Sequence, residues 1–330
     1  MKVLVTGPDG LLGSNLVREL IGRKYEVSAF TENGQKSATI SSLDITRVVG
    51  DILNVEDLMN ATNGIDVVIH CAASTNMYPP RMEMVNRVNI GGTENVILAC
   101  QKNKVKRLIY VGTANSFRSG DKKVPGNEMN EYAAGHYGLD YMDSKYKAQL
   151  LVLEKVKTDG LNAIVVNPTF MIGPYDSRPS SGEMIRAVHN KKVPGYTPGG
   201  KNFVAVKDVT VAIANAITKG EKGNCYILGH ENLSYKEAFL KIAKCMDVKP
   251  PKLMLSKKVV RAYGKGSSIF AGIFKFYPKI THELAILSTE NHFYSSKKAV
   301  DELEMPQTPI EHAIIDCYDW FIDNNYLTKK

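Results

Sequence analysis

A short apolar run, Lys2 to Thr6, leads directly into a turn that carries Gly7, Gly10 and Gly13 and opens a helix with leucines at every fourth position. In a parallel α/β sheet, glycines at these places allow a tight turn, a close approach of the backbone to a diphosphate, and close packing of helix on strand. A turn that merely joins strand to helix is the alternative, which the preceding strand disfavours. We therefore expect a dinucleotide whose diphosphate lies on the helix N-terminus, with contacts from Gly7, Asp9, Gly10, Leu11, Leu12 and Gly13.

Strand and helix signals then alternate along the chain, which is the pattern of a parallel sheet built from crossover units. Further helices are expected at Val88 to Asn103, Tyr141 to Thr158, Val209 to Ile217 and Tyr235 to Met246. The seven expected strands are Lys2 to Thr6, Glu26 to Phe30, Arg47 to Gly50, Val67 to Cys71, Arg107 to Val111, Asn162 to Val166 and Asn224 to Leu228. The fold class predicted is α/β, a doubly wound parallel sheet of the Rossmann type.

The alternation weakens after Asn167, where prolines and glycines break the chain into loops. Loops of this length in a compact enzyme usually bind something. We predict a dinucleotide-binding domain over residues 1–170 with a return segment at about 203–230, and a smaller, interleaved C-terminal substrate-binding lobe over 171–202 and 231–330.

Composition excludes several classes of protein. The net charge is +8, but Lys and Arg are spread along the whole chain, so we expect a basic surface that attracts anionic small molecules and no nucleic-acid partner. Five widely spaced cysteines lack the short pairs of zinc sites, and no metal is expected. With no apolar run of about 20 residues and no signal peptide, a cytoplasmic protein without a membrane span is predicted.

The densest basic stretch, Lys257 to Lys279, also holds large apolar residues. A helix that lines a substrate lobe is favoured here over a helix that lies on a membrane surface. The aromatic residues of this region suggest an apolar substrate more than a sugar, although the same residues would fill an ordinary core. They are Tyr263, Phe270, Phe274, Phe276 and Tyr277.

The end of the second expected strand bears on the choice of cofactor. An acid there would hold the adenosine ribose hydroxyls, whereas basic or small polar residues admit a 2′-phosphate. The strand ends at Phe30 and Thr31, with Glu32 next and Lys36 close by. NADP(H) is favoured and NAD stays possible.

Two further strand ends are expected to contact the cofactor. Asp51, with Ile52 beside it, follows the third strand and is placed to accept from the adenine amino group. Ala72 and Ala73 follow the fourth strand and leave space for the cofactor ribose. A capping aspartate and core alanines are the alternatives.

Tyr141 and Lys145 lie one turn apart on an expected helix, so both side chains project from one face. A carbonyl that accepts a hydride needs a proton, and a neighbouring ammonium lowers the pKa of a phenol toward the working range. Tyr294 and Lys298 share the spacing, but only the first pair follows the fifth strand of the nucleotide-binding region. Tyr294 is therefore interpreted as a packing residue.

Thr113 lies just past the fifth strand, at the sheet edge where parallel sheets bind ligands. Its hydroxyl could bond the substrate oxygen. A lone Thr at a strand end is usually structural, but together with Tyr141 and Lys145 the catalytic role is favoured here. His70, on the fourth strand, is interpreted as a core histidine with satisfied hydrogen bonds.

In this order the motifs resemble the extended short-chain dehydrogenase/reductase superfamily of the NAD-dependent epimerase/dehydratase type. The motifs that match begin with the glycine turn, Gly50 with Asp51, and the run Asn89 to Asn95 (NIGGTEN). They continue with Tyr141, Ser144, Lys145 and Ala148, then with Asn167, Pro168, Gly173 and Pro174, and end with Val206 to Val209. Within the superfamily, three segments look most like the bacterial dihydroflavonol-4-reductase-like branch: NPTFMIGPYDSRP from Asn167, CYILGHENLSYKEA from Cys225 and HFYSSKKAVDEL from His292.

The resemblance implies roles for the candidate residues. Tyr141 would be the acid-base residue, Lys145 its tuner and a ribose ligand, Thr113 a hydrogen-bond donor to substrate, and Asn89 part of a proton relay. It also implies that Pro168 and Phe170 flank the nicotinamide, and that the two helices near Val88 to Asn103 and Tyr141 to Thr158 form a homodimer face.

Departures from the family pattern narrow the function. Gly112 stands where many relatives carry Ser, and Ala114 and Asn115 stand where sugar-nucleotide dehydratases carry Asp and Glu, so dehydration is disfavoured. The function expected is NAD(P)-dependent reduction of a ketone or aldehyde, or oxidation of a secondary alcohol, with a small-molecule substrate. A nucleotide-sugar epimerase with tightly bound NAD is the alternative. A redox sensor or scaffold without turnover would have no need of the phenol.

Overall fold

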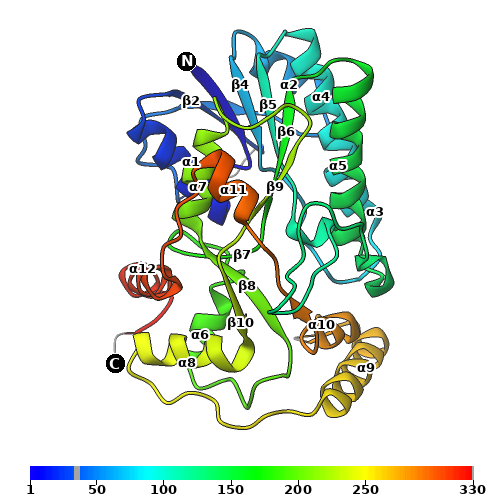
Figure 1. Ribbon diagram of the computed structural model, residues 1–330, viewed down its shortest axis with the longest axis vertical. Coiled ribbons are helices and arrows are strands. Elements are labelled where there is room, and N and C mark those ends of the chain that lie inside the picture. The colour runs from blue at the N-terminus through cyan, green and yellow to red at the C-terminus, as the bar shows by residue number, and fades with distance from the viewer. Residues whose placement is uncertain (33–37, 279, 329–330) are drawn as a thin grey trace.

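The computed structural model describes residues 1–32, 38–278 and 280–328, and its larger part is a twisted parallel sheet between helices (Figure 1). Seven strands pair in the order β3-β2-β1-β4-β5-β6-β9. They are β1 Lys2–Thr6, β2 Glu26–Thr31, β3 Thr46–Val49, β4 Val67–His70, β5 Arg107–Val111, β6 Ala163–Pro168 and β9 Cys225–Leu228. All adjacent pairs are parallel. The Rossmann-type sheet expected from the sequence is confirmed, and each strand ends within two residues of its expected place.

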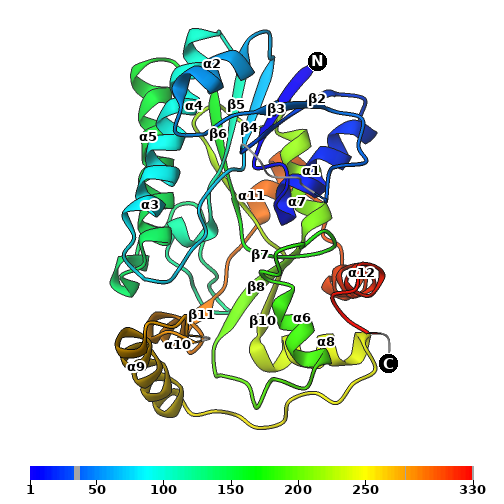
Figure 2. The same cartoon turned by 180° about the vertical axis from the view of Figure 1, so that it is seen from behind.

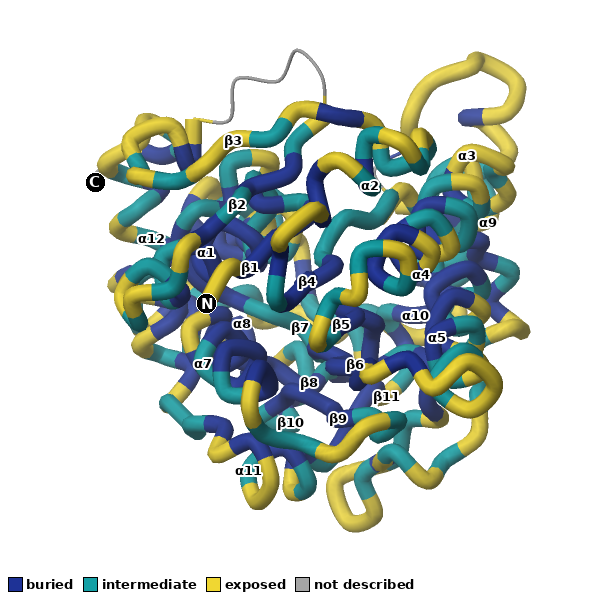
Figure 3. The backbone as a smooth tube through the Cα atoms, turned by 90° about the horizontal axis from the view of Figure 1, so that it is seen from above, coloured by how far each residue is buried: buried dark blue, intermediate teal, exposed yellow. Residues whose placement is uncertain are grey.

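Helices cover both faces of this sheet because side chains alternate along its buried strands. Val3 and Val5 of β1 pack against one group of helices, while Leu4 packs against the other. The first group is α1 Leu11–Gly22, α7 Val206–Asn215 and α11 Lys297–Leu303. The second group is α2 Val55–Thr62, α4 Gly92–Lys102 and α5 Asp140–Thr158. The view from behind shows the two groups on opposite sides (Figure 2), and β1 and β4 form the buried centre between them (Figure 3).

A smaller sheet lies below the first and is organised around β8, Gly200–Ala205. β10 Glu231–Ser234 pairs antiparallel to it, while β7 Phe170–Ile172 and β11 Asn291–His292 pair parallel. Around it lie α6 Glu183–His189, α8 Tyr235–Cys245 and α12 Ile310–Asp323. The segment at 203–230 thus runs from the small sheet through α7 to β9 of the large one. The division into a cofactor domain and a substrate-binding lobe stays a prediction.

Shorter elements follow β4 and β5 of the large sheet, in the segments that carry several candidate residues. They are α3 Glu83–Asn86, the π-helix η1 Arg87–Gly91, and the 3₁₀ turns η2 Ala114–Ser116 and η3 Ala134–Tyr137. A helical pair, α9 Lys257–Phe274 and α10 His282–Leu287, lies beside the small sheet (Figures 1 and 2).

The helix expected in the basic stretch is present as α9, but its surroundings differ from the expectation. The aromatic residues that were expected to line a substrate pocket or fill a core are exposed instead. They are Tyr263, Phe270, Phe274, Phe276 and Tyr277. The reason is that α10 covers only the face of α9 that carries Val260, Gly264 and Ala271.

Candidate active site

The glycine turn between β1 and α1 is tight, packs closely on its neighbours and is open at one face. Gly7 has φ +64°, and a Cβ there would lie 2.8 Å from the backbone nitrogen of Ala72. A Cβ at Gly13 would lie 2.1 Å from the Gly7 carbonyl oxygen, so only glycine lets α1 pack this closely. At Gly10 the nearest atom would be 3.8 Å away, which leaves this face open. Among the described residues no side chain caps α1.

These features of the glycine turn are compatible with the diphosphate of a bound dinucleotide. The amides of Leu11, Leu12 and Gly13 belong to the first turn of an uncapped helix, whose unpaired N–H groups and positive dipole end attract an anion. Asp9 also makes a contact outside the turn. Its carboxylate forms an ion pair with Arg178 at 2.5 Å, which ties the turn to the loop after β7. The sequence offered no signal for this pairing.

The candidate adenosine contacts lie at the ends of β2 and β3. Thr31 ends β2, and its carbonyl accepts a hydrogen bond from Gly50 at 2.9 Å. Lys36 lies outside the described residues. Asp51 is exposed, and one of its carboxylate oxygens accepts from the Leu53 amide at 2.8 Å, so it does stabilise the local turn. Its neighbour Ile52 packs against α4 at Gly92, where a Cβ would lie 3.0 Å from it.

His70 links β4 to β1 and to α4. The Thr93 hydroxyl donates to the Asn89 carbonyl at 2.7 Å, so its oxygen accepts from His70 Nε2 at 3.1 Å. His70 Nδ1 then accepts from the Thr6 hydroxyl at 2.8 Å, whose oxygen accepts from the Ala72 amide at 3.2 Å. Burial, together with the charge of Lys145, lowers the pKa of His70 to about 3. This histidine is neutral and fully hydrogen-bonded. Through the Thr6 hydroxyl it helps to hold the Ala72 amide, and with it the half-buried Ala72 and Ala73 that follow β4.

Lys145 and Tyr141 project from the first turns of α5 beneath the end of β5. Lys145 is 3% exposed, donates to the Val111 carbonyl at 2.6 Å, and lies 4.4 Å from the ring centre of Tyr110. Burial lowers the pKa of Lys145 to about 7. Burial raises the pKa of Tyr141, against a hydrogen bond from Thr113 that lowers it.

The expected effect of the ammonium on the phenol is therefore not what the structure shows. The pKa of Tyr141 lies above its ordinary value because desolvation outweighs the Thr113 contact, and the Lys145 ammonium is held by the Val111 carbonyl. Tyr141 is accordingly protonated at neutral pH, which is the form that can donate a proton.

Thr113 is buried at the end of β5 and is fixed from both sides. Its hydroxyl oxygen accepts from the Asn115 amide at 3.3 Å, and its carbonyl accepts from Asn167 Nδ2 at 3.0 Å. Asn167 also donates to Gln149 at 2.7 Å. A Cβ at Gly112 would lie 2.5 Å from Asn167 Nδ2, which explains why this chain carries glycine at that position.

Asn89 lies in the π-helix η1, a rare element often found at functional sites. Its side chain accepts from the Ser74 amide at 2.7 Å and donates to the Ser74 carbonyl at 3.0 Å and to Ser144 Oγ at 2.9 Å. Ser144 in turn donates to the Tyr141 carbonyl at 3.1 Å. These bonds hold α5 in register with η1, so Asn89 positions the helix that carries Tyr141.

Pro168 ends β6 and Phe170 begins β7, where the chain passes from the large sheet to the small one. Phe170 is half-buried and packs edge-on against Phe203, with ring centres 5.3 Å apart. Lys201 Nζ lies 4.4 Å from the centre of the Phe170 ring, and burial lowers the pKa of this lysine to about 8. Sequence reasoning missed Lys201, which no motif marks.

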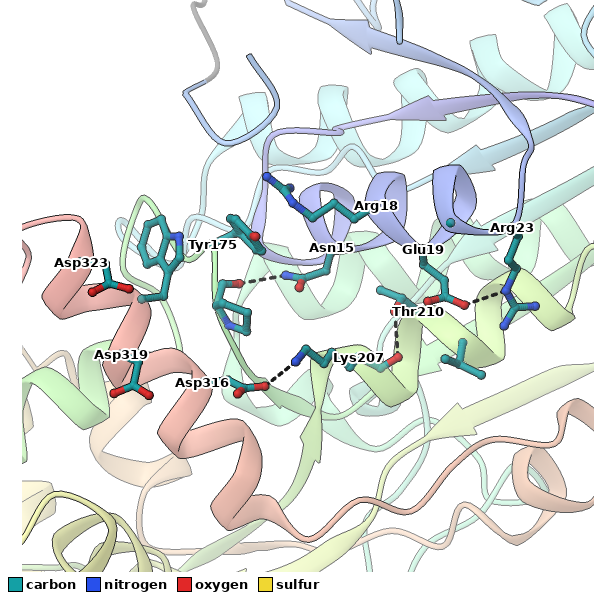
Figure 4. A pocket seen from close by; sticks show the side chains of 14 residues that line it. Asn15, Arg18, Glu19, Arg23, Tyr175, Lys207, Thr210, Asp316, Asp319 and Asp323 are labelled. Atoms are coloured by element: carbon teal, nitrogen blue, oxygen red, sulfur yellow. Dashed lines mark hydrogen bonds and ion pairs between the residues drawn. The ribbon is translucent and has the colours of Figure 1, made fainter. Parts of the chain in front are cut away.

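Two cavities differ in their relation to these residues. One of about 810 Å³ lies between α1, α7 and α12 (Figure 4) and is lined by charged groups, among them Lys207 and Asp316, which pair at 2.6 Å. It contains none of the candidate catalytic residues. A smaller one of about 160 Å³ is lined by Asn115, Tyr137 and His292 among others. Tyr137 packs in the same apolar cluster as Tyr141, so this second cavity is the better candidate for substrate.

Comparison with known proteins agrees with this geometry. Residues 3–229 match the model of the NAD dependent epimerase/dehydratase family. A Synechocystis protein provisionally named a dihydroflavonol 4-reductase is 28% identical, and the alignment covers 99% of this chain and 96% of that protein. A 3-beta-hydroxysteroid dehydrogenase of Mycolicibacterium neoaurum is 26% identical over 98% of this chain and 92% of its own length.

A solved structure is similar over the whole length. The crystal structure of gox2253 superposes with a TM-score of 0.87 at 30% sequence identity, and the match covers 99% of both chains.

Proposed function

The chain belongs to the NAD dependent epimerase/dehydratase family, within the extended short-chain dehydrogenases/reductases, and on that basis we propose that it reduces a ketone or aldehyde with NAD(P)H. The reverse reaction would oxidise the matching secondary alcohol. Two nearly full-length relatives bear the names of a reductase and a dehydrogenase, which supports redox chemistry.

The observation that carries this proposal is the set formed by Tyr141, Thr113 and Lys145 at the end of β5. A bound nicotinamide would supply or accept the hydride. The Tyr141 phenol, which is protonated at neutral pH, would donate a proton to the substrate oxygen. Thr113 would hold that oxygen in place, and Lys145 has further N–H donors for hydroxyls of the cofactor ribose.

A Tyr141→Phe variant tests the proton step, because it removes the hydroxyl and keeps the ring. We expect turnover with a reducible carbonyl to fall by roughly 10²- to 10⁴-fold, the usual contribution of a general acid. Affinity for the dinucleotide, measured by calorimetry, should be nearly unchanged.

The matched control is Tyr146→Phe on the same helix, whose ring stacks on Tyr132 with centres 4.2 Å apart. Its turnover should equal that of the parent protein. Equal turnover in Tyr141→Phe and the parent would remove Tyr141 from the mechanism. Tightly retained NAD with no net oxidation of cofactor by any carbonyl would instead favour a nucleotide-sugar epimerase.

We also propose a preference for NADP(H). The last residue of β2 is Thr31, a small polar residue where an acid would exclude the 2′-phosphate. Calorimetry should therefore give a lower dissociation constant for NADPH than for NADH, and Thr31→Asp should reverse the order by repelling the phosphate. Tighter binding of NADH by the parent protein would contradict the preference.

A homodimer through α4 and α5, and a cytoplasmic location, complete the proposal. Both helices expose leucines, Leu98 and Leu150, on their outer faces. No helix in the described part of the chain has the length and apolar character needed to cross a bilayer.

A further inference from the structure

α9 carries two apolar stripes, and only one of them is covered. The covered stripe contains Val260, Gly264 and Ala271. It packs against α10 so closely that a Cβ at Gly264 would lie 2.4 Å from the Cβ of Ala285. One face of α9 is therefore fixed to the protein.

The second stripe faces solvent. It consists of Val259, Tyr263, Phe270, Ile273 and Phe274, each at least 59% exposed. Their spacing places them along one side of the helix, and Phe276 and Tyr277 extend the patch beyond its end. A contiguous apolar patch of this kind on a protein surface marks an interaction site.

The charge around this patch bears on which kind of partner would fit it. From Val248 to His282 the sequence has no Asp or Glu and eight Lys or Arg residues. Of these, Arg261 pairs with Glu290 at 2.7 Å. Lys258 and Lys265 flank the exposed stripe on α9. Two copies of the chain joined through this face by a twofold axis would bring the same cations together, which costs energy.

An anionic lipid surface satisfies both features at once, since its headgroups complement the lysines and its acyl region accepts the apolar side chains. We propose that the exposed face of α9, together with Phe276 and Tyr277, binds the surface of a bilayer that contains anionic lipid. The binding is peripheral, because no helix of the described residues is suited to cross a membrane.

The position of α9 connects this surface to the candidate active site. α10 lies between α9 and α5, and its Leu284 and Leu287 pack in one cluster with Tyr141. At the end of the patch, the ring of Tyr277 packs edge-on against Tyr78, with centres 5.1 Å apart. On the proposed function, an apolar carbonyl compound dissolved in the bilayer would thus enter close to Tyr141.

Vesicle flotation with the purified full-length chain tests the proposal. Vesicles of phosphatidylcholine alone are compared with vesicles that also contain phosphatidylglycerol. We expect binding to the second kind only, weakened by salt because exposed charges are screened. Phe270→Ser/Phe274→Ser should reduce the bound fraction by about tenfold or more, given the apolar area removed.

The matched control is Val124→Ser/Met129→Ser, which changes two exposed apolar residues outside α9 and should leave binding unchanged. Failure of the parent protein to bind phosphatidylglycerol vesicles would overturn the proposal. So would an oligomer that dissociates in Phe270→Ser/Phe274→Ser, since a second copy would then be the occupant. The assay needs no turnover, so loss of the proposed reductase activity with vesicle binding intact would count against the reaction alone.

Discussion

At the scale of single residues, the candidate site depends on which buried polar groups donate hydrogen bonds and which accept them. His70 is the clearest case, because Thr6 and Thr93 use both of its ring nitrogens. The neutral ring connects β1, β4 and α4 beside the glycine turn. A charged ring would have one N–H donor too many for this network.

His70 therefore makes stability depend on pH. Its folded pKa of about 3 lies below the ordinary 6.5, so the unfolded chain binds more protons between these values, and stability falls as pH drops below 6.5. Urea unfolding should show a loss from this group of up to about 1.4 kcal/mol per pH unit. His70→Gln should be less stable at pH 7 yet lack this part of the slope. Equal slopes in both proteins would contradict the network.

At the scale of elements, α10 contributes to the buried surroundings of Tyr141. It packs with Leu139 and Met142 of the segment that begins α5, and this cover contributes to the burial that raises the pKa of Tyr141. α10 is in turn held by α9 through the close approach at Gly264. The helical pair is thus part of the candidate site although it carries none of its polar groups.

Two glycines of α9 test this contact. At Gly264 an added Cβ meets Ala285 and the Thr281 carbonyl, so Gly264→Ala should separate the helices and reduce amide-exchange protection in α10. At Gly266 nothing lies within 4 Å, so Gly266→Ala should stabilise α9 by about 0.5–1 kcal/mol through the lower backbone entropy of the unfolded chain. Equal protection in the two variants would show that the approach is not tight.

At the scale of the whole molecule, the two sheets meet where β6 passes into β7. The chain crosses from Pro168 of the large sheet to Phe170 of the small one, which brings the candidate nicotinamide neighbours to the boundary. The outer faces of α4 and α5 lie away from this boundary, on the far side of the large sheet from α1 and α7 (Figure 2). A dimer through those helices would leave both the site and α9 accessible.

Sedimentation measurements can test that dimer. Leu98 on α4 and Leu150 on α5 are 39% and 46% exposed, so Leu98→Glu/Leu150→Glu should give a monomer by placing charges in the interface. Leu240→Glu is the control, since this residue is 47% exposed on α8 at the other end of the molecule. A parent protein that sediments as a monomer, or a variant that stays dimeric, would refute this interface.

The local pattern of the sequence determined the large sheet and the glycine turn between β1 and α1. Buried parallel strands are short apolar runs, and helices repeat every 3.6 residues, so both are visible without knowledge of their neighbours. The glycines of the turn are equally local, because each is required by the backbone within a few residues. For the same reason Tyr141, Lys145 and Thr113 could be named from their places after a strand end or on a helix face.

Contacts between segments distant in the sequence determined the side-chain partners, the pKa of Tyr141 and the exposure of α9. Three such contacts join residues whose separation in the sequence follows no helix or strand period. They are Asn167 with Gly112, Arg178 with Asp9, and Lys201 with Phe170. The rise in the pKa of Tyr141 depends on burial that elements remote in sequence complete. The apolar residues of α9 have the same helical spacing whether they face a core or solvent. Only the packing of α10 on the other stripe determined which of them are buried.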